Sequence, residues 1–90
     1  YFQGHIDEAM TLFKQQERIC RELDCASGLA ISLANQARVL AEKMNQYAQA
    51  LPLAEEAYRT ATEQGLMRHA KWIKPILDFA RAKSRRTNDH

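Results

Sequence analysis

Residues 5–30, HIDEAMTLFKQQERICRELDCASGLA, can be laid over residues 46–70, QYAQALPLAEEAYRTATEQGLMRHA. The equivalent positions pair Ala9 with Ala50, Leu12 with Leu53, Arg18 with Arg59 and Glu22 with Glu63. After a slip of one residue in the loop, they pair Ala30 with Ala70, Leu33 with Ile73 and Ala37 with Leu77. Self-similarity at a period of about 40 residues is typical of stacked helical repeats, in which each unit buries its apolar face against the next.

The composition and the apolar spacing predict helices along almost the whole chain. Its 90 residues include only 3 glycines and 2 prolines, and strong helix formers dominate the rest. Apolar residues at helical spacing predict four helices, over residues 6–23, 28–44, 47–64 and from Met67 to about residue 83. Gly65 is expected to end the third helix as a left-handed cap. Short connections make neighbours antiparallel, so we expect an all-α fold of antiparallel helix-turn-helix repeats, an α-solenoid fragment of about four helices.

The two ends of the chain are expected to lie outside this helical domain. Residues 1–4, YFQG, resemble the end of a viral protease site used to remove affinity tags, so residues 1–5 are taken as a tag remnant and linker. The helical domain is then residues 6–83, and residues 84–90, SRRTNDH, are expected to form a disordered polar basic tail. Pro75 predicts either a kink in the fourth helix or a later start for it, and we favour the kink.

The central part of the chain resembles a tetratricopeptide repeat, of the longer-helix variety found in kinesin light chains. The residues that carry the resemblance are Leu33, Asn35 and Ala37 in one helix and Tyr47, Ala50, Leu53 and Ala57 in the next. The alanines let the two helices of a pair approach closely, while larger residues fill the gaps between pairs. The longer period also fits paired-helix repeats of the HEAT or armadillo kind, which remain the alternative.

The resemblance implies a concave groove that holds an extended peptide or a helix. Its wall would be formed by Ile31, Asn35 and Arg38 of the second helix and by Lys71, Lys74 and Asp78 of the fourth. An asparagine at the place of Asn35 often hydrogen-bonds the peptide backbone in this family, although an interhelical hydrogen bond is an equal alternative. The basic residues suit an acidic segment or a free carboxylate, but they also fit a merely solvated face. Trp72 is interpreted as a core or interface residue rather than a ligand anchor.

The residues that would support catalysis or metal binding do not occur in a recognisable pattern. His5, His69 and His90 have no metal-ligand spacing, and no Gly-rich phosphate loop or paired nucleophile and base can be recognised. We therefore expect no enzyme activity, metal or cofactor. Cys20 and Cys25 are too few for a disulfide framework, and they indicate structural thiols, one in the core and one in a loop. This cysteine usage favours a reducing, cytoplasmic location, and no stretch is apolar enough to cross a membrane.

These observations predict a protein-interaction module that binds a peptide or a helix of a partner. The alternative is a structural segment that self-associates through exposed ends of the solenoid. Nucleic acid is the least favoured partner. Its candidate residues are the basic cluster of Arg81, Lys83, Arg85 and Arg86. That cluster is short and lacks aromatic residues beyond Phe79, so it is better interpreted as a solubilising tail.

Overall fold

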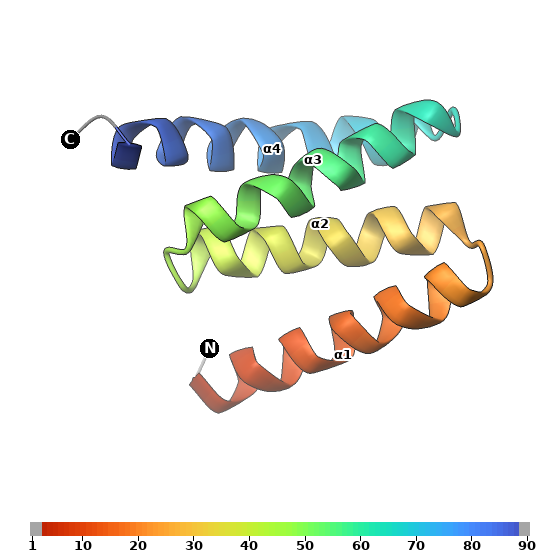
Figure 1. Ribbon diagram of the computed structural model, residues 1–90, viewed down its shortest axis with the longest axis horizontal. Coiled ribbons are helices and arrows are strands. Elements are labelled where there is room, and N and C mark those ends of the chain that lie inside the picture. Colours follow the sequence, from red (N-terminus) through yellow and green to blue (C-terminus); the bar gives the residue numbers. More distant parts are fainter. Residues whose placement is uncertain (1–2, 89–90) are drawn as a thin grey trace.

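The computed structural model describes residues 3–88, which form four α-helices and no strand. The helices are α1 (Gln3–Glu22), α2 (Ala26–Glu42), α3 (Tyr47–Glu63) and α4 (Met67–Asn88). Successive helices run antiparallel, and the α1–α2 and α3–α4 turns lie at the same end of the molecule (Figure 1). The predicted all-α fragment of four helices is therefore confirmed.

The second helix is the centre of the arrangement. α2 packs against α1, α3 and α4, whereas the backbone of α1 approaches only α2 within the described residues. In Figure 1, α2 and α4 run in nearly the same direction, and α1 and α3 are both inclined to them. A closed four-helix bundle would bring α1 and α4 together. The contact between α2 and α4 instead gives a stack of helices with two open ends.

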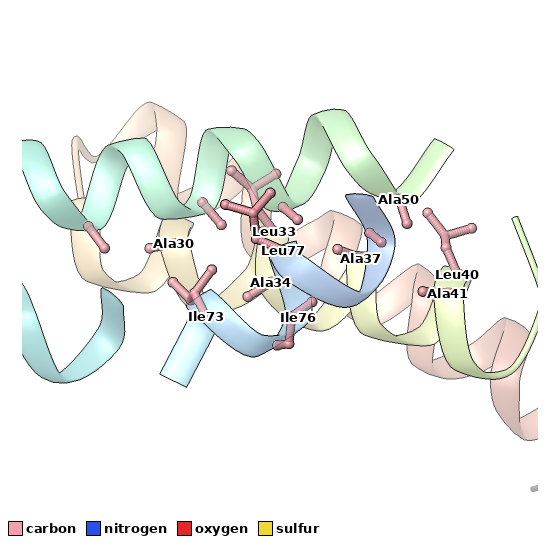
Figure 2. Close-up of a cluster of buried hydrophobic side chains, with 14 of the residues drawn as sticks. Ala30, Leu33, Ala34, Ala37, Leu40, Ala41, Ala50, Ile73, Ile76 and Leu77 are labelled. Carbon is pink, nitrogen blue, oxygen red and sulfur yellow. The ribbon is translucent and has the colours of Figure 1, made fainter. Parts of the chain in front are cut away.

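Small side chains line the contact between α2 and α3, as Figure 2 shows. The eight alanines of this contact, here called the alanine seam, are Ala30, Ala34, Ala37 and Ala41 of α2 and Ala50, Ala54, Ala57 and Ala61 of α3. Each is at most 1% exposed. Residues three or four apart share one side of a helix, so each helix presents a strip with no side-chain atom beyond Cβ. Leu33, Ile73 and Leu77 fill the remaining space.

A chain of polar contacts connects the first three helices. The amide of Gln36, which is 2% exposed, donates from Nε2 to Oε1 of Glu17 on α1 over 2.8 Å. Glu17 also accepts from Arg21, and Arg21 reaches Glu56 of α3 at 3.0 Å. The buried amide therefore has its partner, and α1 is joined to both α2 and α3 by its polar side chains.

The turns that end α1 and α3 are closed by a residue in the left-handed region. Gly65 has φ 69°, which confirms its predicted role as a cap. Asp24 is the left-handed residue of the turn after α1, with φ 55°. Because this single residue reverses the chain, α2 already begins at Ala26, and Gly28 lies inside the helix rather than at its predicted start.

Both ends of the helical domain extend further than the sequence predicts. α4 continues to Asn88, so the prediction that residues 84–90 are disordered is wrong for residues 84–88, while residues 89–90 lie outside the described residues. Ser84 follows Ala80 by one helical turn and is buried, because a serine is small enough to continue the buried side of α4 that includes Ala80. At the other end α1 begins at Gln3 rather than Ile6, and residues 1–2 also lie outside the described part.

Pro75 lies within α4, which starts at Met67. The alternative that this helix begins after the proline is therefore wrong, and the kink stays a prediction. Proline has no N–H, so the carbonyl of Lys71 lacks its usual helical donor. Pro75 is exposed, which allows that carbonyl to be solvated.

Enlarging the alanine seam should destabilise the protein. Ala57→Leu adds three carbon atoms where the exposed fraction is 0%, so we expect the free energy of unfolding to fall by about 1–3 kcal/mol. Ala48→Leu, on the exposed face of the same helix, should change it by less than about 0.5 kcal/mol. Urea unfolding followed by circular dichroism measures both. Equal losses in the two variants would contradict the close approach of α2 and α3.

Removing the acceptor of the buried amide should also be costly. Glu17→Ala leaves the Gln36 amide buried without its partner, and we expect a loss of about 1–3 kcal/mol in the free energy of unfolding. Glu17→Gln keeps an acceptor oxygen and loses only exposed ion-pair energy, so about 0–1 kcal/mol is expected. A larger loss for Glu17→Gln than for Glu17→Ala in the same urea titration would refute this account.

Candidate functional site

An open cavity of about 650 Å³ lies between α3 and α4. Part of its lining is apolar and comes from Tyr58 of α3 and from Met67, Ala70 and Pro75 of α4. Binding sites are usually concave surfaces of about 300–1,000 Å³ with mostly apolar walls. This hollow, which we call the α4 cavity, therefore has the size and the character of a site for another apolar surface.

Charged side chains form the rest of the α4 cavity. They are Arg68, Lys71, Lys74 and Asp78. Lys74 Nζ lies 3.3 Å from Asp78 Oδ1 in an exposed ion pair, which contributes little to stability. Arg68 and Lys71 form no ion pair with any residue in the described part of the chain. The surroundings of the cavity are thus positively charged and suit an acidic partner.

The internal repeat explains why this face of α4 is open. Forty residues earlier, Ala30 and Ala34 of α2 occupy the positions of Ala70 and Lys74. Both alanines are fully buried in the cluster formed with α3 and α4 (Figure 2). No further helix follows α4 among residues 3–88, so the equivalent face of α4 is covered only in part. The α4 cavity is therefore the place where the next helix of a continued repeat would pack.

The predicted residues of α2 lie elsewhere. Arg38 is exposed and lines a separate, smaller cavity with Glu42, while Ile31 and Asn35 are half-buried. The Asn35 amide makes no hydrogen bond with the described residues, so it does not form the interhelical bond that was the alternative for it.

The structure thus brings together three of the six predicted site residues, namely Lys71, Lys74 and Asp78, in the α4 cavity. None of the five cavities described for residues 5–85 joins them to Ile31, Asn35 or Arg38. A groove shared by α2 and α4 therefore stays a prediction.

Sequence reasoning missed the apolar part of this site. The apolar lining residues that it did not assign to the site are Tyr58, Met67, Ala70 and Pro75, and it did not assign the charged Arg68 to the site either. A usable signal was present in the repeat, because Lys74 stands where the aligned helix has Ala34. A charged residue at the place of a buried alanine indicates a face that is not covered in the same way.

A second unpartnered apolar surface lies on α1. Leu12, Ile19 and Leu23 are 64%, 53% and 73% exposed. Their spacing places them on one strip of the helix, which we call the α1 strip. The other side of α1, with Ile6 and Met10, is the buried one. Such an exposed strip of large apolar residues is typical of a surface that meets another protein.

Trp72 is not a core residue, since it is 40% exposed on α4. Phe79 is similarly exposed, and its ring meets Tyr47 edge to face with centroids 6.2 Å apart. Lys83 Nζ lies 5.7 Å from the centroid of the Phe79 ring. Phe79 thus contacts other residues of the chain. The interpretation of Trp72 as an interface residue stays a prediction.

The described side chains contain no group of three or more His, Cys, Asp or Glu residues that could hold a metal ion. Within the same part of the chain, no helix is long and apolar enough to cross a membrane. No family model, curated protein or solved structure matches the chain. The likeness to tetratricopeptide repeats therefore rests on the residues of the sequence itself.

Proposed function

We propose that this chain is a protein-interaction module of the tetratricopeptide kind, which holds a helix or an extended segment of a partner protein. The observation that carries the proposal is the α4 cavity, where an apolar lining and an uncovered helix face coincide. Two free cysteines fit a reducing compartment, and we propose the cytoplasm as its location.

A helix is the occupant that fits the cavity best. In the repeat, the equivalent face of α2 is covered by a helix, so a partner helix would reproduce packing that the chain already uses. It would cover the apolar surfaces of Tyr58, Met67 and Ala70. Arg68 and Lys71 would then lie beside the bound helix and attract acidic residues on its flank. An acidic amphipathic helix is therefore the proposed ligand class.

Charge reversal should test this assignment. We expect the double variant Lys71→Glu, Lys74→Glu to bind a synthetic acidic amphipathic helix at least about tenfold more weakly than the unchanged chain. Lys14→Glu makes one such charge reversal on an exposed position of α1 and should leave the affinity unchanged. Isothermal titration calorimetry measures all three proteins.

The same titration separates the α4 cavity from the predicted groove on α2. Asn35→Ala and Arg38→Ala should bind the peptide as the unchanged chain does. Weaker binding in these two variants, with full affinity in the lysine variant, would place the site on α2 instead. Absence of binding to the unchanged chain would contradict the proposal as a whole.

Self-association is the second candidate function, and a specific match between the two ends favours it. By the repeat, α1 corresponds to α3, but α1 has no helix in the place that α2 takes beside α3. Conversely, α4 has no helix in the place that α3 takes beside α2. The repeat aligns the seam positions of α3 with Ala9, Phe13, Gln16 and Cys20 of α1, so the α1 strip lies beside that face rather than on it. The α1 strip of a second copy still offers an exposed apolar surface of the kind that the α4 cavity lacks.

The charges of the two surfaces are complementary. Glu8 precedes Leu12 by one helical turn and Glu22 follows Ile19 by three residues, and both acids are exposed. They would face the basic surroundings of the α4 cavity. Because the two surfaces differ, the contact is heterologous, and repeated contacts give rings or open chains rather than a symmetric dimer.

An exposed charge on the α1 strip should abolish this association. The unchanged chain is expected to show a mass above that of one 10.3 kDa chain, rising with concentration in multi-angle light scattering. Leu12→Glu should remain a monomer with unchanged stability, since Leu12 is mostly exposed. Thr11→Glu, on the neighbouring exposed position, should associate normally. A strict monomer at every concentration would remove this candidate.

A further inference from the structure

The turn after α1 brings two cysteines together. Asp24 has φ 55°, and the N–H of Cys25 donates to the carbonyl of Cys20 over 2.9 Å. This bond, across five residues with a left-handed residue before its donor, is the hydrogen bond of a Schellman motif. In that motif the side chains of the two bonded residues frequently touch. The turn therefore sets Cys20 and Cys25 side by side.

The equivalent turn after α3 contains two apolar residues at the positions of the two cysteines. There Gly65 has φ 69°, and the N–H of Leu66 donates to the carbonyl of Ala61 over 2.8 Å. The repeat aligns Ala61 with Cys20 and Leu66 with Cys25. One turn thus pairs two apolar residues, and the other pairs two thiols in the same geometry.

Gly28 leaves space that both sulfur atoms border. A Cβ on Gly28 would lie 2.5 Å from Cys20 Sγ and 3.2 Å from Cys25 Sγ. Both sulfur atoms therefore face the same glycine, and neither is bonded to another cysteine. A side chain at this position would displace the Cys20 sulfur.

The two thiols differ in exposure and in acidity. Cys25 is exposed at the N-cap of α2, where the backbone N–H of Gly28 and then the Ser27 hydroxyl lower its pKa. Cys20 is buried, and burial followed by the neighbouring Cys25 raises its pKa. An exposed thiol with a lowered pKa beside a buried thiol is the arrangement of an attacking and a resolving cysteine.

We propose that Cys20 and Cys25 are a reversible redox pair, which a hydroperoxide converts into an intrachain disulfide. The Cys25 thiolate attacks the outer peroxide oxygen and breaks the O–O bond, which gives a sulfenic acid and releases an alkoxide or hydroxide. The Cys20 sulfur then attacks the Cys25 sulfur, the S–S bond forms and the hydroxyl leaves as water. Two electrons pass from the thiols to the peroxide, and an external dithiol returns them through thiol–disulfide exchange.

The test uses the reduced full chain and hydrogen peroxide. The unchanged protein should lose both free thiols and the mass of two hydrogen atoms while each chain stays separate, and dithiothreitol should restore both. Cys20→Ser should stop at a sulfenic acid on residue 25, which dimedone traps. Cys25→Ser should consume peroxide about tenfold more slowly, because the remaining thiol is buried.

Two further variants separate a redox pair from simple packing. Cys20→Ala with Cys25→Leu copies the turn of Ala61 and Leu66. This variant should have the same melting temperature as the reduced protein and should not react with peroxide. Gly28→Ala should slow disulfide formation about tenfold by displacing Cys20, with alkylation of Cys25 unchanged. Retention of both thiols in peroxide, or disulfides formed only between chains, would overturn the proposal.

Discussion

The close approach of α2 and α3 is the contact on which the other contacts depend. It is possible because the alanine seam contains no side-chain atom beyond Cβ along about three turns of each helix. The two backbones can then lie near enough for α4 to rest on both, with Ile73 and Leu77 filling the space between them. α1 uses the remaining side of α2. A larger residue at one seam position would therefore alter where α4 lies as well as the pair itself.

The helices were predictable because apolar residues recur at helical spacing, short connections make neighbouring helices antiparallel, and Gly65 favours a left-handed cap. The two ends of the helical domain were less predictable. The end of the chain is polar in composition, yet one small residue, Ser84, at the right spacing continues the buried strip of α4. Composition averages over a segment, whereas packing requires only the residue on one face.

The candidate site was predictable only in part, for a related reason. Lys71, Lys74 and Asp78 lie together along the α4 cavity, but what that surface meets depends on the neighbouring helix and not on α4.

The pairing of Cys20 with Cys25 was not predicted, for a different reason. Residues five apart share no face of a regular helix, and the left-handed Asp24 is what brings them together. Backbone conformation of this kind is only weakly specified by a residue other than glycine.

The attachment of α1 determines which part of the protein opens locally at the lowest free energy. Its backbone meets α2 alone, and the turn at Asp24 is the single covalent link between them. Detaching α1 leaves the α2–α3 contact and α4 intact, so the molecule divides into a three-helix cooperative unit and an appended arm with a lower free energy of local opening. Amide protons of α1 would then exchange with solvent ahead of those in the other helices. Leu12, Ile19 and Leu23 all belong to this arm, so local opening would move the whole α1 strip away from the other three helices.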